Sequence, residues 1–373
     1  MAVWQSSLEK LVTMFKDLYK GRKILVTGHT GFKGSWLSLW LRELGAEVIG
    51  LSLPPASSPN HFDLLKLDIE SHFIDIRDEN KLQNRIQALQ PDIIFHLAAQ
   101  SLVRRSYQEP IETWASNVMG TVNILNAARD VDNLEAVVVV TTDKCYENKE
   151  WMWGYRELDP LGGHDPYSAS KAGSELVTAS FRNSFFNLPS SALIASARAG
   201  NVIGGGDWSE DRLIPDLIRS IESNNALHIR SPNATRPWQH VLDCLSGYLV
   251  LGQELLQGNK SCAEAWNFGP ERDSNRQVQE VLQTIKKYIP GFYWSQSEGL
   301  QPHEAQLLHL DISKASKNLS WRPVWSFEEG VEATVNWYKA WLDRKEVISL
   351  AQLKAYSDLA CANGLKWASE KSK

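Results

Sequence analysis

Short apolar runs alternate with helical patterns along the first half of the chain. The apolar runs, each short enough for a buried strand, cover residues 23–28, 47–53, 72–78, 91–99 and 135–142. Between them, apolar residues recur at helical spacing over 35–46, 79–90 and 113–130. Strands that alternate with helices of ten or more residues predict a parallel sheet with helices on both faces. We therefore expect an α/β fold with a doubly wound parallel sheet, in which the run at 72–78 is an edge strand.

The pattern loosens after about residue 200. A glycine-rich stretch, "GGGDW", is followed by loops bounded by proline and by isolated helical segments. This half of the chain predicts a smaller, irregular α/β lobe on the carboxyl edge of the sheet. At the other end, the first 20 residues mix charges of both signs with apolar residues, which favours a short amphipathic helix over a signal peptide.

Composition narrows the class of protein. With 373 residues, 43% hydrophobic and 22% charged, the chain can bury a large core. The net charge of -5 argues against general binding to nucleic acid. No apolar run reaches 18 residues, so we expect no membrane span and a cytoplasmic protein. The four cysteines form no CxxC pair and lack histidines at ligand spacing, so we expect neither a metal site nor a disulfide.

The stretch "TGHTGFKG" places glycines at GxxGxxG spacing between the first strand and the first helix. A tight turn, close backbone approach and a helix N-terminus directed at negative charge are what a pyrophosphate requires. This context predicts a Rossmann-type dinucleotide site built on Gly28, Gly31 and Gly34. The neighbouring Lys33 has two readings, a contact to a 2′-phosphate or a solvated loop cation.

The second strand ends in "GLSL" and offers Ser52 where a dinucleotide site commonly has a carboxylate. Asp75, with Ile76 beside it, is better placed to reach the adenine. The missing acid leaves NAD and NADP both open from the residues alone.

Two polar clusters suggest a reaction centre. "TTDK" follows the buried run "VVVV", at a strand end where open sheets bind ligands. Downstream, Tyr167 and Lys171 are four residues apart, which stacks them on one face of a helix. An ammonium beside a phenol stabilises the phenolate and lowers its pKa, so the pair predicts a tyrosine base.

Taken together, these motifs resemble the extended short-chain dehydrogenase/reductase family. The resemblance rests on GxxGxxG, "HLAAQ", "NVMGT", Thr142 and YxxxK in this order, and it covers residue 21 to about residue 337. It implies a nicotinamide cofactor, NAD, bound tightly and regenerated in each turnover. The cofactor residues that it implies are Gly28, Thr30, Gly31, Phe32, Lys33, Gly34, Asp75, Ile76, Leu97, Ala98, Ala99, Gln100, Asn117, Tyr167, Lys171 and Arg198.

The family resemblance also implies a division of the chain. It places the NAD-binding domain at 21–197 with about 237–267, and a nucleotide-sugar domain at about 198–236 and 268–345. Residues 1–20 form an N-terminal extension and residues 346–373 a C-terminal tail. Helices carrying "NVMGTVNIL" and "YSASKAGSELV" pair across a two-fold axis in relatives, so the resemblance implies a homodimer.

Five further stretches are similar to the CDP-glucose 4,6-dehydratases of this family. They are "TDKCY", "NKEWMWGY", "RAGNVIGGGDW", "RPWQHVL" and "WNFGP". This likeness implies CDP-glucose as substrate. Tyr167 takes the proton of the sugar 4-hydroxyl, Thr142 hydrogen-bonds that hydroxyl, and Lys171 holds the nicotinamide ribose. Asp143 is then the acid at the 6-hydroxyl.

Lys144 stands where related dehydratases usually have Glu. It serves as the base at C5 only if burial lowers its pKa; as a cation it stabilises the enolate or pairs with Asp143. These alternatives remain open.

The substrate residues that the likeness implies are Asn201, Arg212, Arg236, His303 and Glu304, with both arginines on the diphosphate. His240 and Asp243 fit either a substrate contact or the packing of the next helix. Rival readings are another sugar-nucleotide dehydratase or 4-epimerase of the same fold, and a non-catalytic relative that binds RNA or other partners.

Overall fold

The computed structural model describes residues 11, 13–297, 305 and 307–369. Seven parallel strands of this described part form the central sheet, in the order β11-β6-β5-β4-β1-β2-β3. Their bounds are β1 Lys23–Thr27, β2 Glu47–Ser52, β3 Glu70–Phe73, β4 Ile93–His96, β5 Ala136–Val140, β6 Leu193–Ala199 and β11 Ala265–Phe268. The expected doubly wound sheet is thus confirmed. Its edge strand β3 covers 70–73, so most of the run expected as an edge strand at 72–78 lies after the strand. The strand order reverses between β1 and β4, which is where such sheets bind ligands.

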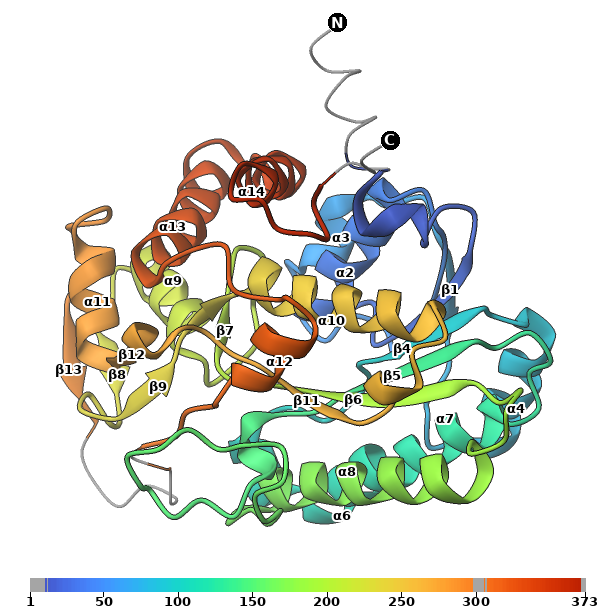
Figure 1. Ribbon diagram of the computed structural model, residues 1–373. Helices are drawn as coiled ribbons and strands as arrows, with labels where there is room; N and C mark the ends of the chain where they lie inside the picture. Colours follow the sequence, from blue (N-terminus) through green and yellow to red (C-terminus); the bar gives the residue numbers. More distant parts are fainter. Residues whose placement is uncertain (1–10, 12, 298–304, 306, 370–373) are drawn as a thin grey trace, which may run out of the picture.

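Two helical layers cover the sheet, as Figure 1 shows. Alternate side chains of each buried strand face opposite layers, so β5 contributes Val138 to one core and Val137 to the other. One layer holds α2 Phe32–Glu43, α3 His61–Leu65, α10 Val241–Leu256 and α14 Ser349–Ala362. The other holds α4 Glu79–Leu89, α6 Pro110–Trp114, η2 Ala115–Met119, α7 Gly120–Ala128 and α8 Pro166–Phe185.

The helix expected over 113–130 is interrupted by a π-helical turn. α6, η2 and α7 run on from one another, and the five residues of η2 are wound as a π-helix. Such turns widen the helix and often lie at functional sites. Here the turn contains Asn117, which belongs to the predicted cofactor site.

The second half of the chain builds the predicted irregular lobe. Its small strands pair as β10–β7, β12–β9 and β13–β8. Their bounds are β7 Val202–Ile203, β8 Leu227–Ile229, β9 Thr235–Pro237, β10 Gln239–His240, β12 Asn275–Gln277 and β13 Trp294–Gln296. The helices of the lobe are α9 Leu213–Ser223, α11 Val278–Lys286, α12 Ser313–Asn318 and α13 Phe327–Arg344. Short helical turns elsewhere are η1 Met14–Asp17, η3 Asp143–Cys145, η4 Lys260–Cys262 and η5 Arg272–Ser274.

Both ends of the described chain pack on the sheet domain. The expected C-terminal tail contains α14. Leu353 and Tyr356 of this helix, and Trp367 beyond it, are buried in the main core. Phe15 stacks on Trp367 at 5.0 Å between ring centroids, and its amide donates to the Trp367 carbonyl. The amphipathic helix expected within residues 1–20 falls mostly outside the described residues.

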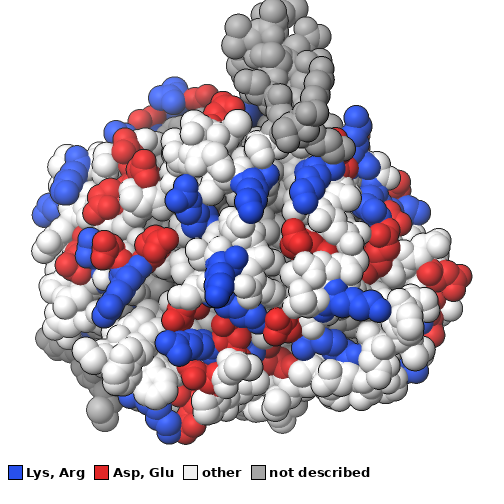
Figure 2. Space-filling model, in the orientation of Figure 1, with Lys and Arg blue, Asp and Glu red and all other residues white. Residues whose placement is uncertain are grey.

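Charge is spread over the surface. Figure 2 shows basic and acidic side chains interspersed on one face. None of the helices in the described part of the chain is long and apolar enough to cross a bilayer.

Candidate active site

A cavity of about 1470 Å³ lies at the carboxyl edge of the sheet. Its walls come from the loop after β1, the ends of β4 and β5, the start of α8, and the lobe. All of the predicted cofactor and catalytic residues line it except Asn117 and Arg198.

The glycines of the loop after β1 are required by close approach. Gly28 has φ of +76°, and a Cβ there would lie 2.8 Å from the Ala98 nitrogen of the β4 end. At Gly34, a Cβ would lie 2.0 Å from the Gly28 carbonyl oxygen, so α2 can begin close to β1 only with glycine. Gly31 precedes α2 directly, which directs the N-terminus of this buried helix toward the cavity. The loop therefore fits a dinucleotide pyrophosphate.

Lys33 departs from one of the two readings drawn from the sequence. Its Nζ lies 3.5 Å from the Tyr248 hydroxyl of α10, and the side chain is half-buried along the cavity wall. It is therefore not a solvated loop cation. The helix dipole disfavours a cation in the first turn of α2, where Lys33 lies. The Tyr248 hydroxyl provides the Lys33 ammonium with a hydrogen-bond partner in the cavity wall.

The ends of β2 and β3 form the outer part of the same cavity. Ser52 ends β2, and its hydroxyl lies 2.6 Å from that of Thr30 in the glycine loop. Asp75 lies on the cavity wall with Ile76, and Arg77 binds its carboxylate through Nε and Nη2. These hydrogen bonds hold the pKa of Asp75 below its usual value, so it presents a carboxylate.

The "TTDK" stretch forms a short turn at the end of β5. Thr142 caps η3 by accepting from the Lys144 amide at 3.3 Å, and its hydroxyl donates to Asp143 Oδ1 at 3.0 Å. Asp143 is 1% exposed, and its Oδ2 is buried with no hydrogen-bond partner in the described structure. Lys144 is half-buried on the cavity wall, and among the described ion pairs none joins it to Asp143.

Tyr167 and Lys171 lie on one face of α8 as predicted, both buried and both on the cavity wall. The direction of the tyrosine shift is opposite to our expectation. Burial raises the pKa of Tyr167 to about 12, which outweighs the lowering by the Thr142 hydrogen bond and by the charge of Arg212. Burial, helped by the charge of Lys33, lowers the pKa of Lys171 to about 8. The Lys171 ammonium donates to the Val140 carbonyl at 3.1 Å.

Two predicted cofactor residues stand behind the cavity wall instead of on it. Asn117 is buried and brackets Gln100, accepting from its amide at 2.8 Å and donating to its carbonyl at 2.9 Å. Arg198 is buried in an ion pair of 2.8 Å with Glu175, four residues beyond Lys171 on α8. Glu175 also accepts from Thr141 and Ser196, so this pair ties β5, β6 and α8 together.

The lobe brings three predicted substrate residues to the cavity. They are Asn201, Arg212 and Arg236. Arg212 donates to Asp207 at 3.1 Å and to Ser101 at 3.3 Å, which places its guanidinium between the lobe and the sheet domain. His303 and Glu304 lie outside the described residues. His240 and Asp243 are buried and do not line this cavity; Asp243 accepts from the Val324 amide, so packing accounts for them.

Sequence reasoning missed two polar partners of Arg212. Asp207 lies within the quoted "GGGDW" and Ser101 directly follows "HLAAQ", so both border motifs that were recognised. Asp207 follows the motif glycines and Ser101 follows a strand end, and these positions could have marked both as candidates. The sequence does not show that both side chains contact Arg212.

With the fold and cavity in place, comparison with known proteins decides the family. The sequence model described as "GDP-mannose 4,6 dehydratase" matches residues 25–334. The chain belongs to this 4,6-dehydratase family. It is 48% identical over 354 residues to the CDP-glucose 4,6-dehydratase of Salmonella typhimurium, covering 93% of this chain and 98% of the relative. A dTDP-glucose 4,6-dehydratase of Xanthomonas campestris is 29% identical, over 84% of this chain and 92% of the relative.

Solved structures agree with the assignment to the 4,6-dehydratase family. DesIV, a dTDP-glucose 4,6-dehydratase from Streptomyces venezuelae with NAD bound, matches with a TM-score of 0.74 and 26% identity. The match covers 85% of this chain and 96% of DesIV. The UDP-glucose 4-epimerase of Thermotoga maritima has the same TM-score of 0.74 at 22% identity, over 86% of this chain and 99% of the epimerase. That second likeness shows the shared fold alone.

Proposed function

We propose that the protein is a CDP-glucose 4,6-dehydratase, a hydro-lyase that converts CDP-D-glucose to CDP-4-keto-6-deoxy-D-glucose and water. The product would serve deoxysugar biosynthesis. The observation that carries the proposal is 48% identity, over nearly the full length of both chains, to an enzyme of that name. The cavity supports it, because Thr142, Asp143, Tyr167 and Lys171 line one continuous space at the carboxyl edge of the sheet.

The cofactor that we propose is NAD, which DesIV also binds. When bound, NAD supplies the hydride acceptor for C4 and returns the hydride to C6, so it is regenerated in each turnover. The glycine loop would hold the pyrophosphate, and Asp75 with Ile76 would meet the adenosine. The segment Leu97–Gln100 would pass beside the cofactor, held in place by Asn117. Arg198 becomes a positioning residue in this proposal, because it acts through Glu175.

The first chemical step is oxidation at C4 of the sugar. Tyr167 accepts the proton of the 4-hydroxyl, and Thr142 hydrogen-bonds the same oxygen. With its pKa raised to about 12 by burial, Tyr167 is a phenol at neutral pH in the ligand-free protein. It therefore needs positive charge beside it to act as a base. Below its pKa of about 8, Lys171 carries that charge, and Arg212 adds to it.

The second step removes water across C5 and C6. The 4-ketone makes the C5 proton acidic, and the 6-hydroxyl leaves as water once it receives a proton. Asp143 is suited to give that proton, since its Oδ2 is buried without a partner beside the cavity. We assign removal of the C5 proton to Lys144 as a hypothesis. If Lys144→Ala keeps full exchange of the C5 proton with solvent, this role is excluded.

The lobe would bind the sugar nucleotide. Arg212 and Arg236 would hold the diphosphate with Asn201. Because Asp207 and Ser101 already engage Arg212, a diphosphate would have to share or replace these contacts. In this assignment the sheet part, 21–197 with about 237–267, is the NAD domain. The nucleotide-sugar domain is about 198–236 with 268–345.

We further propose a homodimer formed through α6, η2 and α8. Large apolar side chains are exposed on these helices, including Ile111, Trp114, Met119 and Leu176. α6 and α8 lie side by side along the lower side of the molecule in Figure 1. A second copy would cover these side chains. Since both proposed ligands are nucleotides of the metabolic pool, we place the enzyme in the cytoplasm.

The test is to incubate the protein with CDP-glucose and NAD⁺ and to measure the mass of the sugar nucleotide. Parallel tubes hold dTDP-, UDP- and GDP-glucose. Loss of one water from the CDP-sugar alone supports the proposal and its nucleotide preference. An unchanged mass in every tube overturns it, and galactose in the UDP-glucose tube would indicate a 4-epimerase.

A further inference from the structure

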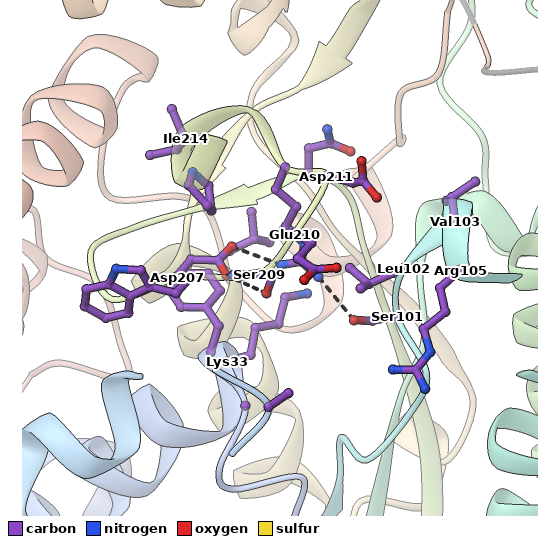
Figure 3. A pocket seen from close by; sticks show the side chains of 18 of the residues that line it. Lys33, Ser101, Leu102, Val103, Arg105, Asp207, Ser209, Glu210, Asp211 and Ile214 are labelled. Carbon is purple, nitrogen blue, oxygen red and sulfur yellow. Dashed lines mark hydrogen bonds and ion pairs between the residues drawn. The ribbon is translucent and has the colours of Figure 1, made fainter. Parts of the chain in front are cut away.

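Two contacts cross the mouth of the cavity and join the lobe to the sheet domain. Arg104, in α5 (Val103–Gln108), forms an ion pair of 2.8 Å with Asp211 of the lobe. Beside it, Arg212 donates to the hydroxyl of Ser101 at 3.3 Å. Figure 3 shows the loop with Asp207, Ser209 and Asp211 facing the segment Ser101–Arg105, with Lys33 of the glycine loop nearby.

On the lobe side, this loop is firmly held. Asp207 accepts from both the amide and the hydroxyl of Ser209, at 3.0 and 2.7 Å. Tyr338 of α13 donates to the Asp207 carbonyl. Arg219 of α9 donates to the carbonyls of Trp208 and Ser209, at 3.1 and 3.0 Å. These contacts therefore anchor the loop to the lobe.

The sheet-domain side is also braced. The Gln100 side chain accepts from the Leu102 amide at 2.6 Å and donates to the Leu102 carbonyl at 3.1 Å. It also donates to Thr113 of α6 at 2.9 Å. Both sides of the cavity are held by internal hydrogen bonds. Among the contacts between them, the solvent-exposed ones cost the least free energy to break. The Arg104 and Asp211 side chains are 44% and 34% exposed.

We propose that Arg104 is a positioning residue whose ion pair with Asp211 latches the lobe over the cavity, holds Arg212 at Ser101, and slows the release of bound dinucleotide. The inference rests on the proposed function only in taking a nicotinamide dinucleotide as a ligand of this cavity. Arg212 lies close enough to Tyr167 for its charge to act on that hydroxyl. A latched lobe thus keeps a cation beside the reacting oxygen. Opening would separate the two walls that a ligand between the glycine loop and Tyr167 must pass.

The expected effect is small because the pair is exposed. Losing an exposed ion pair changes an equilibrium by about two- to fivefold, and added salt screens it further. The test therefore uses a direct rate. Protein loaded with NADH is mixed with a large excess of NAD⁺, and the decay of bound-NADH fluorescence gives the release rate. We expect Arg104→Ala to speed release about two- to fivefold at low salt.

Asp211→Asn is the second variant. Asp211 has φ of +58°, a conformation that Asn tolerates, so this change removes charge without adding backbone strain. It should match Arg104→Ala. The exchanged pair Arg104→Asp with Asp211→Arg should recover part of the slow release. Arg344→Ala is the control, since Arg344 pairs with Glu346 at 2.9 Å, is exposed, and does not line the cavity.

The outcomes separate the latch from the proposed function. A protein that binds no NADH contradicts the proposed function and the latch together. Normal NADH binding with unchanged release in both charge-removing variants overturns the latch alone. The latch is equally overturned if Arg344→Ala speeds release as much as Arg104→Ala does.

Discussion

The two oxygens of Asp143 have different surroundings. Oδ1 accepts from Thr142 at 3.0 Å, whereas Oδ2 is buried with no partner in the described structure. An unpaired buried oxygen costs free energy in the folded state, on the order of 1–3 kcal/mol. A carboxylic acid that meets the 6-hydroxyl of a sugar would give this oxygen a partner.

Asp143→Asn tests that role with nearly the same shape. An amide cannot supply the acidic proton, so we expect loss of water to slow by about 10²–10⁴-fold. Oxidation at C4 should continue, which would appear as absorbance of reduced nicotinamide without the product mass. Water loss at the wild-type rate would exclude Asp143 as the acid.

Individual site residues differed in how far the sequence could place them. Tyr167 and Lys171 were predictable together because helical spacing alone puts them on one face. The positions of Asn117 and Arg198 were not predictable, because a polar residue in a motif can either contact a ligand or support residues behind the cavity wall. Arg198 is turned away by Glu175, and that partner comes from another part of the chain. The raised pKa of Tyr167 depends on burial, which spacing does not reveal.

At the scale of elements, the start of α2 depends on one glycine. A Cβ at Gly34 would lie 2.0 Å from the Gly28 carbonyl oxygen, which is backbone and cannot rotate away. We expect Gly34→Ala to shift the loop and weaken NADH binding by roughly tenfold or more, which corresponds to about 1.4 kcal/mol. Fluorescence titration with NADH measures this.

Gly291→Ala is the matched control, since nothing lies within 4 Å of a Cβ there. It should leave NADH affinity unchanged. A thermal melt of both variants separates local damage from unfolding. Wild-type affinity in Gly34→Ala would contradict the role given to the glycine loop.

The proposed dimer can also be tested on single elements. Leu176 of α8 is 62% exposed, and Ile111 of α6 is 85% exposed. A carboxylate buried without a partner in an apolar interface is costly, so Leu176→Glu should yield monomers at micromolar concentration. Leu158→Glu is the control, because Leu158 is 97% exposed and lies in the loop before α8. Light scattering reads the mass; a monomeric wild type would refute the dimer.

The elements themselves were largely readable from periodicity, with instructive exceptions. Alternating strands and helices through residue 140 predicted five of the seven sheet strands, because each pattern is local. The strands β6 and β11 were not predicted. The π-helical turn Ala115–Met119 was not predicted, since hydrophobic spacing does not distinguish a π-helical turn from the α-helix around it. α14 was expected as a tail because its partners, such as Trp40, lie some 300 residues earlier.

Across the whole molecule, the lobe was the least predictable part. It is assembled from short pairs such as β8 with β13 and β9 with β12, whose partners are separated by intervening helices. Short strands carry too few residues for a pattern. A cavity at the carboxyl edge of the sheet was predictable from the strand pattern. The wall that the lobe adds to this cavity was not, because the lobe itself could not be predicted.

Buried histidines make the stability of the whole molecule sensitive to acid. Burial lowers the pKa of His61, His96 and His240 to about 3, and that of His29 to about 4. As pH falls below about 6.5, these groups take up protons in the unfolded chain but not in the folded one. Their contribution to stability is therefore complete above pH 6.5 and is lost as pH falls toward 3–4.

Asp243 acts in the opposite direction. Burial raises its pKa to about 7, so the folded protein takes up a proton between pH 7 and about 4 that the unfolded chain does not. Near pH 5, the four histidines bind about four more protons in the unfolded chain than in the folded protein, and Asp243 binds about one fewer. The unfolded chain thus holds about three extra protons, so the free energy of unfolding falls by roughly 4 kcal/mol per pH unit. The net loss between pH 7 and pH 5 is on the order of 5 kcal/mol, comparable with the whole stability of many domains. We expect the Tm to fall by roughly 6 °C over this range.

The variant Asp243→Asn removes the proton uptake of Asp243, which opposes the effect of the histidines. Asn can still accept from the Val324 amide and the Tyr356 hydroxyl, the contacts that Asp243 makes at 2.6 and 2.8 Å. It cannot titrate, so the variant lacks the proton uptake that partly offsets the histidines. Its Tm should therefore fall more steeply than that of the wild type between pH 7 and pH 5. Thermal melts of both proteins across this range measure the difference, and parallel curves would show that Asp243 does not titrate there.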